Sequence, residues 1–298
     1  MNIVITGGLG FVGSYLSTFF LEKGAHVTAI GLRPTQNLIY HGRFRYISAD
    51  TTQPGAWQNE LSACDAVINL AGKSIFKRWS PTYKKQIRDS RILTTKQVVE
   101  ALPENAETVL CSGSAVGYYG GRGEDVLTET QLSGDDFLAG VCRDWEAEAV
   151  KATQKGIRVV TARLGIVMGQ NGGALQKMLP AFRSFVGGPI GSGMQWFSWI
   201  HLEDLASAFL YAIETPRING PLNFCSPYPV RNRELAATLG DILNRPAFVP
   251  VPAFMIRLVM GEFGNSLLYS IRTVPDRLTR HGFEFHYPGI RNALVNLL

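Results

Sequence analysis

The fold is decided by the stretch Asn2-Ile3-Val4-Ile5-Thr6-Gly7-Gly8-Leu9-Gly10-Phe11-Val12-Gly13. Its apolar beginning predicts a buried parallel strand, and glycines spaced three apart then lead into a helix predicted over residues 14–23. Such a turn presents backbone N–H groups at a helix N-terminus, where they can bind a pyrophosphate. The alternative is a glycine-rich turn without a ligand. We favour a Rossmann-type dinucleotide site whose phosphate-binding residues are Gly7, Gly10, Phe11, Val12 and Gly13.

The residues after the second predicted strand, at 26–30, favour NADP over NAD. Folds that prefer NAD usually place an Asp or Glu at the end of this strand to bind the ribose 2′-hydroxyl. This chain has no acidic residue between Glu22 and Asp50, and its second strand leads to Arg33. An arginine can pair with a 2′-phosphate. We therefore expect NADP as the cofactor and keep NAD as the alternative, while Arg33 can also be an ordinary exposed loop residue.

Further cofactor contacts are predicted where other strands end, because ligands bind at the carboxyl edge of a parallel sheet. Asp50 follows the third strand and either accepts the adenine amino group or forms a turn. Leu70, Ala71 and Gly72 follow the fourth strand, and their small size lets the backbone pass beside the cofactor. Ser112 ends the fifth strand.

The order of predicted elements is that of an α/β protein with a Rossmann-type, doubly wound parallel sheet. Strands near 2–6, 26–30, 45–48, 66–70, 108–112 and 158–164 alternate with helices near 14–23, 81–102 and 137–155. After about residue 170, glycines and prolines break the chain into loops and short helices. We expect residues 1–170 to form the NAD(P)-binding domain, with return elements near 196–225 that include a strand at 196–200 in the main sheet. Residues 171–195 and 226–298 would form a smaller C-terminal substrate-binding lobe.

Composition narrows the classes of partner. The net charge is +5, and the Lys and Arg residues are scattered without a nucleic-acid-binding run. Neither the four cysteines nor the five histidines show metal-ligand spacing, and the cysteines are typical of reduced thiols. No signal peptide and no apolar run long enough for a bilayer is recognisable. We expect a cytoplasmic protein that binds no metal, nucleic acid or membrane.

Several motifs resemble the extended short-chain dehydrogenase/reductase superfamily, and within it the NAD(P)-dependent epimerase/dehydratase family. They are Thr-Gly-x-x-Gly-x-x-Gly at 6–13, Asn-Leu-Ala-Gly at 69–72 and Ser-Gly-Ser-Ala at 112–115. Other segments resemble an atypical subgroup, the YfcH-type epimerase-family proteins, over nearly the whole chain. These segments lie at 117–120, 145–146, 187–193, 226–232 and in the tail from 244 to 285. The resemblance implies a homodimer formed through the helices near 81–102 and 137–155.

The catalytic pair that is usual in that superfamily is absent. Its members typically carry Tyr-x-x-x-Lys on the helix after the fifth strand, where the lysine lowers the pKa of the proton-transferring tyrosine. No tyrosine of this chain has a lysine four residues later. If Glu146 marks the usual register, Leu138 and Cys142 stand at the tyrosine and lysine positions. Ordinary reductase chemistry is therefore not carried over by the resemblance.

Other residues are candidates for the chemistry. Ser114 can bond a substrate oxygen, and Tyr118 offers a phenol in the following loop. Arg163 and Arg231 are candidates for binding an anionic substrate. One hypothesis is an NADP(H)-binding, epimerase/dehydratase-like oxidoreductase acting on a small anionic substrate such as a nucleotide sugar. The other is a non-catalytic protein that senses NADP(H) and docks to a partner, which the missing Tyr-x-x-x-Lys pair favours.

Overall fold

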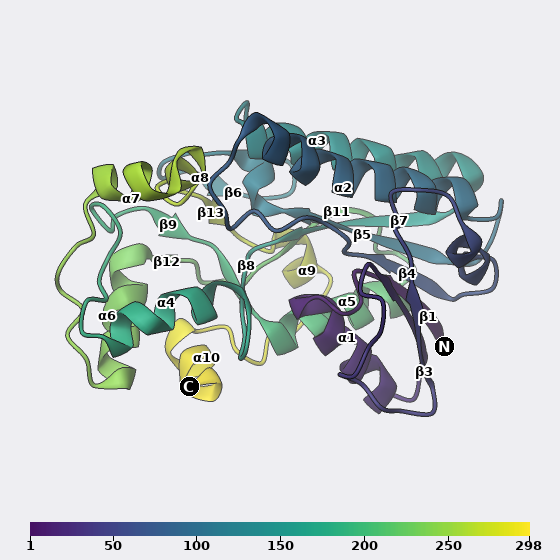
Figure 1. The fold of residues 1–298 in the computed structure, drawn as a ribbon, viewed down its shortest axis with the longest axis horizontal. Helices are drawn as coiled ribbons and strands as arrows, with labels where there is room; N and C mark the ends of the chain where they lie inside the picture. The colour runs from purple at the N-terminus through teal and green to yellow at the C-terminus, as the bar shows by residue number, and fades with distance from the viewer.

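A parallel sheet of seven strands forms the centre of the larger part of the molecule (Figure 1). In this computed structural model, which describes residues 1–298, the strand order is β11-β7-β5-β4-β1-β2-β3. The strands are β1 (Asn2–Thr6), β2 (His26–Gly31), β3 (Phe44–Ser48), β4 (Ala66–Asn69), β5 (Val109–Ala115), β7 (Arg158–Leu164) and β11 (Gly220–Phe224). The direction of strand addition reverses beside β1, so the crevice between β1 and β4 is the place where such sheets bind ligands. The predicted doubly wound Rossmann-type sheet is confirmed.

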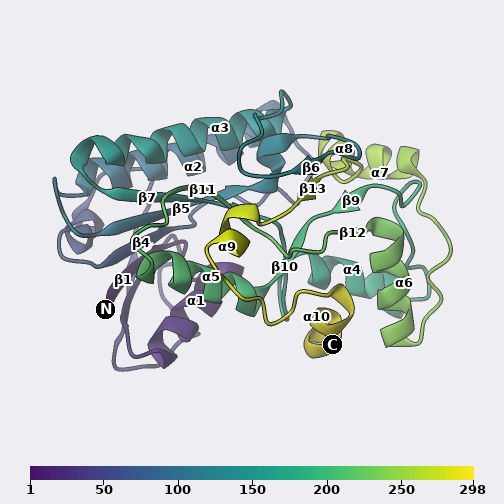
Figure 2. The same cartoon turned by 180° about the vertical axis from the view of Figure 1, so that it is seen from behind.

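Helices cover both faces of this sheet. The long helices α2 (Pro81–Ala101) and α3 (Phe137–Val150) lie together on one face, whereas α1 (Phe11–Glu22) and α5 (Leu202–Glu214) lie side by side on the other (Figures 1 and 2). The alternation along β1 explains the two layers, because successive side chains of a strand point to opposite faces.

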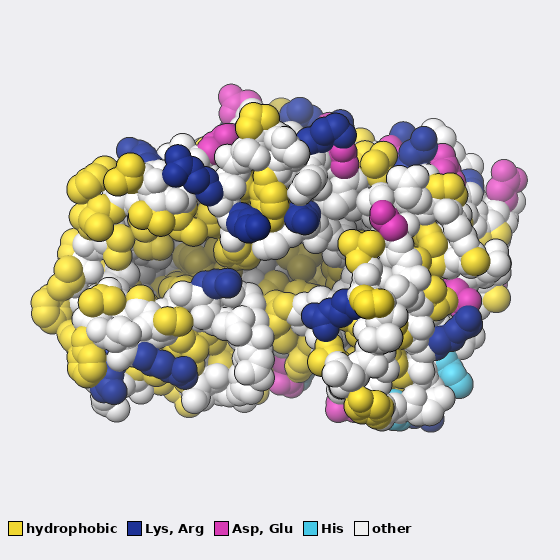
Figure 3. All heavy atoms as spheres, viewed as in Figure 1, with side chains coloured by type: hydrophobic (Ala, Val, Ile, Leu, Met, Phe, Trp, Pro, Cys, Tyr) yellow, Lys and Arg dark blue, Asp and Glu magenta, His cyan; other side chains and the backbone are white.

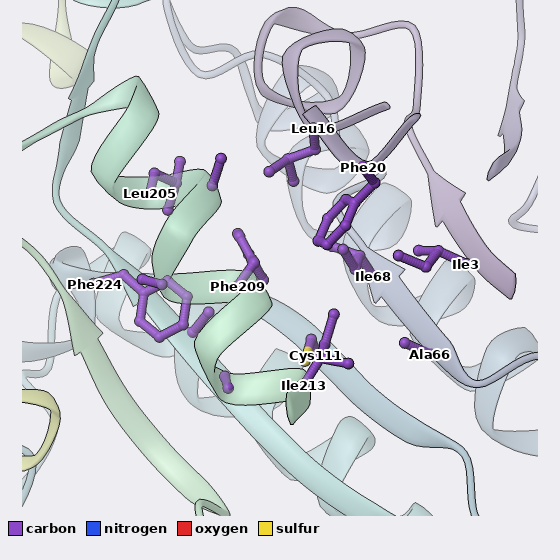
Figure 4. Packing of buried hydrophobic residues seen from close by; sticks show 14 of the residues in the cluster. Ile3, Leu16, Phe20, Ala66, Ile68, Cys111, Leu205, Phe209, Ile213 and Phe224 are labelled. Atoms are coloured by element: carbon purple, nitrogen blue, oxygen red, sulfur yellow. The ribbon is translucent and has the colours of Figure 1, made fainter. Parts of the chain in front are cut away.

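Two hydrophobic clusters fill the space between sheet and helices. Ile3 and Ile5 belong to the cluster under α1 and α5, whereas Val4 belongs to the cluster under α2 and α3. Figure 4 shows part of the cluster under α1 and α5, with Phe20 of α1 and Phe209 of α5 on the side of the helices. The sheet is thus buried on both sides, as its continuous apolar strands predict.

Twelve further strands and α-helices lie outside the main sheet, and some of them share a second core. They are β6 (Val126–Leu127), β8 (Ile166–Met168), β9 (Trp196–Phe197), β10 (Trp199–His201), β12 (Val230–Arg231), β13 (Arg272–Thr273), α4 (Gly173–Arg183), α6 (Asn232–Leu243), α7 (Ala253–Met260), α8 (Glu262–Ser266), α9 (Asp276–Arg280) and α10 (Ile290–Leu297). Trp199, Leu235, Leu239 and Leu294 are buried at the centre of this core. No helix of the chain combines the length and apolarity that a bilayer crossing needs.

The prediction that residues 196–200 rejoin the main sheet is wrong. They form β9 and β10, which pair with β12 and β8 in separate two-stranded sheets. The edge beside β7 is occupied by β11 instead. The chain turns away from β7 at Gly165, where an added Cβ would lie 3.1 Å from the Cβ of Cys225. Beyond this tight turn, β8 and its partner β10 lie outside the sheet, and Ile166 of β8 lines two of the cavities described below.

Candidate functional site

The glycine-rich turn between β1 and α1 has the shape of a phosphate cradle. Gly7 has a φ of +69°, and a Cβ on Gly13 would lie only 2.3 Å from the carbonyl oxygen of Gly7. Both positions therefore need glycine. Gly10 precedes α1 without any side-chain cap, and the first turn holds no acidic residue. The first N–H groups of α1 are consequently available to an anion.

Side chains at the ends of β1 and β4 hold this crevice in place. The Thr6 hydroxyl donates to Oδ1 of Asn69 over 2.6 Å and accepts the N–H groups of Leu70 and Ala71. The Asn69 amide donates in turn to the Thr95 hydroxyl over 2.8 Å. Asn69 therefore ties two strands and α2 together, and it sets the backbone of residues 70–72 opposite Gly7.

A cleft of about 330 Å³ lies along this crevice. The predicted cofactor residues that line it are Gly7, Gly10, Phe11, Val12, Gly13, Leu70 and Gly72. The side chains of Ile75, Leu138, Trp145 and Leu164 add apolar walls. Two further cavities continue it toward α7 and α8, and Figure 3 shows the resulting hollow in the molecular surface. The site is thus a long cleft that starts at the cradle.

Arg33 and Asp50 lie beyond the cleft lining, near the ends of β2 and β3. Arg33 is exposed, and its backbone is held because the Tyr46 hydroxyl donates to its carbonyl over 2.7 Å. Its guanidinium forms no ion pair with the protein. Oδ1 of Asp50 accepts both the N–H and the hydroxyl of Thr52. This is the turn-forming alternative for Asp50, and its contact with an adenine stays a prediction.

The two serines of β5 have different surroundings. Ser112 is fully buried, and its hydroxyl accepts from the Asn69 amide at 3.4 Å, so it does not face the cleft. A cofactor contact by Ser112 stays a prediction. Ser114 lines the cleft, and its hydroxyl donates to Oε1 of Glu146 over 2.6 Å. Of the two, Ser114 is the one whose hydroxyl a bound molecule can reach.

Arg163 is engaged inside the protein. Its Nε and Nη2 donate to the two carboxylate oxygens of Glu146, each over 2.8 Å, and its Nη1 donates to the Tyr119 hydroxyl. Burial opposes the charged guanidinium, but the hydrogen bonds that it donates to Glu146 and Tyr119 outweigh this effect and raise the pKa of Arg163. Arg163 does not line the cleft, so its predicted contact with substrate stays a prediction that the packing does not support.

Tyr118 is likewise absent from the residues that line the cleft. The Arg163 guanidinium lies 3.5 Å from the centre of its ring, which is a close cation–π contact. Its neighbour Tyr119 is fully buried and donates to Oδ1 of Asn223, and burial raises the pKa of Tyr119. The proton-transfer role of Tyr118 therefore stays a prediction, because Tyr118 does not line the cleft.

Arg231 also has a partner in the protein. It forms a two-pronged ion pair with Glu124, at 2.9 and 2.5 Å, and stacks on the ring of Trp196 at 4.0 Å. The hydrogen bonds from Arg231 and Trp196 lower the pKa of Glu124 to about 2. The charge of Arg231 is thus balanced by Glu124, and the binding of an anionic substrate by Arg231 stays a prediction.

Arg91 is the cleft residue that the sequence analysis missed. It lies on α2 and lines the cleft, with its guanidinium 5.4 Å from the ring of Trp145. Its Nη1 donates to the carbonyls of Lys73 and Ile87, and no carboxylate pairs with it. Burial lowers its pKa, although an arginine keeps its proton. The available signal was helical spacing, since Arg91 follows the buried Ile87 by one turn.

The cleft has few groups that can exchange a proton. Cys142, at the expected lysine position, lines it, but burial raises the pKa of this thiol to about 11. Leu138, at the tyrosine position, is apolar and also lines it. Ser114 and Arg91 are therefore the cleft's polar side chains near the end of β5. No group of three or more metal-ligating side chains occurs in the chain.

The sequence and the fold are similar to those of known proteins. The pattern of the NAD dependent epimerase/dehydratase family matches residues 3–224, and a domain of unknown function, DUF1731, matches residues 251–297. The chain is 40% identical over 300 residues to the epimerase family protein SDR39U1 homolog, chloroplastic, of Arabidopsis thaliana, covering 99% of this chain and 86% of that protein.

Two solved structures share the fold and more than 30% of the sequence. The crystal structure of human epimerase family protein SDR39U1 (isoform 2) with NADPH superposes with a TM-score of 0.86 at 31% identity, covering 100% of this chain and 99% of the human one. The nucleoside-diphosphate sugar epimerase from Corynebacterium glutamicum gives a TM-score of 0.78 at 32% identity, covering 100% of this chain and 58% of that one.

Proposed function

The chain belongs to the NAD-dependent epimerase/dehydratase family, and from this premise we propose that it is an epimerase/dehydratase-like oxidoreductase that uses NADP(H) on a small-molecule substrate. The observation that carries the proposal is the cradle at the start of α1, where glycines leave room and no side chain caps the helix. The human relative was crystallised with NADPH, which supports NADP(H) for this chain.

The surroundings of the cradle fit a dinucleotide. The uncapped amides of residues 11–13 would hold the pyrophosphate, and the exposed Arg33 would pair with the 2′-phosphate. Leu70 and Gly72 line the opposite wall, which continues toward Ser114 and Trp145. When bound, NADP(H) supplies or accepts a hydride at its nicotinamide ring.

Two residues of the chain would act on the substrate oxygen. The Ser114 hydroxyl is oriented by Glu146 and retains lone pairs that can accept from a substrate hydroxyl. The unpaired guanidinium of Arg91 would stabilise negative charge that develops on that oxygen. Neither group titrates near neutral pH, so we place the accompanying proton exchange with water. This assignment gives Ser114, rather than Tyr118, the contact with the reacting atoms.

A nucleotide sugar is one substrate that the proposal includes, and the name of the C. glutamicum relative supports it. The two arginines expected to bind such an anion are paired with Glu146 and Glu124 in this chain. A second candidate, non-catalytic sensing of NADP(H), is favoured by the lack of a Tyr-x-x-x-Lys pair. Turnover of any substrate with loss of NADPH absorbance would exclude it.

The assembly and the location stay predictions. A homodimer through α2 and α3 is expected from the resemblance. The Arabidopsis relative is named as chloroplastic, so this relative does not support the cytoplasmic location that the sequence predicts.

The cofactor proposal is tested by calorimetric titration of NADPH and NADH into the wild-type protein and two variants. Arg33→Ala removes the proposed partner of the 2′-phosphate. Arg45→Ala is the matched control, because Arg45 is an exposed arginine of the adjacent strand that pairs with Glu60 at 3.0 Å. A hydrogen-bonded charge contributes about 1.5–3 kcal/mol, so we expect Arg33→Ala to weaken NADPH binding roughly ten- to hundredfold.

The same variant should leave NADH binding nearly unchanged, and Arg45→Ala should alter neither cofactor's affinity. Wild-type protein that binds neither NADPH nor NADH would refute the proposal. Equal losses of both cofactors in Arg33→Ala would remove the assigned role of Arg33.

A further inference from the structure

We infer that the substrate is a predominantly apolar small molecule, held in a cavity between the carboxyl end of the sheet and the helices α7 and α8. The inference rests on the proposed function, because it names the substrate class of the same cleft. We call this cavity the apolar cleft and define it by Trp196, Phe197, Ile256, Met260, Phe263 and Ile271.

The apolar cleft is large and hydrophobic enough for an organic ligand. Its volume is about 450 Å³, and 14 of its 19 lining residues are hydrophobic. Sites for drug-sized ligands span about 300–1,000 Å³ and are lined mainly by such side chains. Figure 3 shows hydrophobic side chains inside the hollow and Lys and Arg side chains around its rim.

The apolar cleft is continuous with the proposed cofactor site. A connecting cavity of about 410 Å³ is lined by Phe263 and Ile271 on the side of the apolar cleft. On its other side it is lined by Phe11, Gly72 and Arg91, which also line the cleft at the cradle. A molecule in the apolar cleft can therefore extend a carbonyl or hydroxyl group toward Ser114 and Arg91.

Three of the polar side chains that border the apolar cleft are hydrogen-bonded within the protein. The Ser198 hydroxyl donates to the carbonyl of Ile271 and accepts the N–H of Thr273. Oδ1 of Asn232 accepts the N–H of Ile190, and the Ser266 hydroxyl donates to a backbone carbonyl. Sugar hydroxyls buried here would lose water without gaining these groups as partners, which is costly.

Buried cations for a diphosphate are also missing from the apolar cleft. Its lining includes no arginine and a single lysine, Lys177, which is exposed. Arg163 and Arg231, which the sequence predicted to bind an anionic substrate, are each paired with a carboxylate, and Arg272 stacks on the ring of Trp196 at 4.3 Å outside the lining. A diphosphate held deep in the apolar cleft would therefore lie away from the Lys and Arg side chains at the rim, without the charged partners that such groups need.

The test measures binding of a neutral apolar probe, N-phenyl-1-naphthylamine, by its fluorescence, with UDP-glucose as the competitor. Met260→Gln places an amide in the apolar cleft. Leu258→Gln is the matched control on the same helix, because Leu258 is 72% exposed and does not line the cavity. NADPH titration of each variant shows that the cofactor site is intact.

We expect saturable binding of the probe, about tenfold weaker in Met260→Gln, since burial of a methionine side chain contributes roughly 1.5–3 kcal/mol. Leu258→Gln and millimolar UDP-glucose should leave binding unchanged. Displacement of the probe by UDP-glucose, equal losses in the two variants, or no saturable binding would each overturn the inference. Loss of NADPH binding with intact probe binding would refute the proposed function instead.

Discussion

The buried ion pair between Arg163 and Glu146 allows a quantitative test of how the wall behind the cleft is held. Both side chains are almost inaccessible, at 4% and 11% exposure, and two hydrogen bonds of 2.8 Å join them. Removal of one partner leaves an unpaired buried charge, which costs about 3–5 kcal/mol. We expect a loss of this size in the free energy of unfolding for Arg163→Met and for Glu146→Leu.

The double variant Arg163→Met/Glu146→Leu distinguishes a charge effect from a packing effect. Because it leaves no charge behind, its loss should be smaller than the sum of the single losses by roughly 2 kcal/mol or more. The measurement is urea unfolding followed by circular dichroism and tryptophan fluorescence. Arg88→Met is the control, because Arg88 and Asp144 form an ion pair whose side chains are 50% and 39% exposed. Such surface pairs contribute about 0–1 kcal/mol.

The reasoning is refuted if the single variants lose no more than the Arg88 control. It is also refuted if their losses add within about 0.5 kcal/mol in the double variant, as losses at independent sites do.

Three further predictions concern the pH dependence, the thiols and the cradle. Burial lowers the pKa of His201 to about 4, so on acidification the unfolded chain binds this proton before the folded protein does. The free energy of unfolding should therefore fall by about 2 kcal/mol from pH 7 to pH 5, and His201→Gln should reduce this pH dependence in urea titrations. Burial raises the pKa of Cys142 to about 11 and all four thiols are buried, so iodoacetamide should label none of them at pH 7 until the protein is denatured; rapid labelling of the native cleft would contradict this, as read by mass spectrometry. A Cβ on Gly172 would lie 2.1 Å from the ring of Phe11, so Gly172→Ala should weaken NADPH binding by about tenfold in fluorescence titrations, whereas Gly42→Ala, which faces open space, should not.

Part of the site could be predicted because its signals are local in the sequence. The glycine spacing requires a cradle wherever a strand runs into a helix, and Gly7 and Gly13 meet that requirement. The absence of Tyr-x-x-x-Lys can likewise be read directly from the residues. The strand at 196–200 was placed wrongly because a short apolar run does not specify which strand it pairs with.

The partners of the charged residues could not be predicted from neighbouring positions in the sequence. Arg231 and Glu124 are 107 residues apart in the sequence and Arg163 and Glu146 are 17 apart, yet each arginine is matched to its carboxylate. From the sequence, Arg163 and Arg231 were predicted to bind an anionic substrate, and no carboxylate was identified as a partner of either. Only the approach of distant segments shows which charges are neutralised.

The sequence by itself determined the doubly wound sheet and its phosphate cradle, because apolar periodicity and glycine geometry act over a few neighbouring residues. Tertiary structure alone decided which polar groups remain free at the cleft, leaving Arg91 unpaired and pairing the predicted Arg163 and Arg231. The physical reason is that hydrogen bonding and desolvation depend on neighbours in space, and folding brings those neighbours from remote parts of the chain.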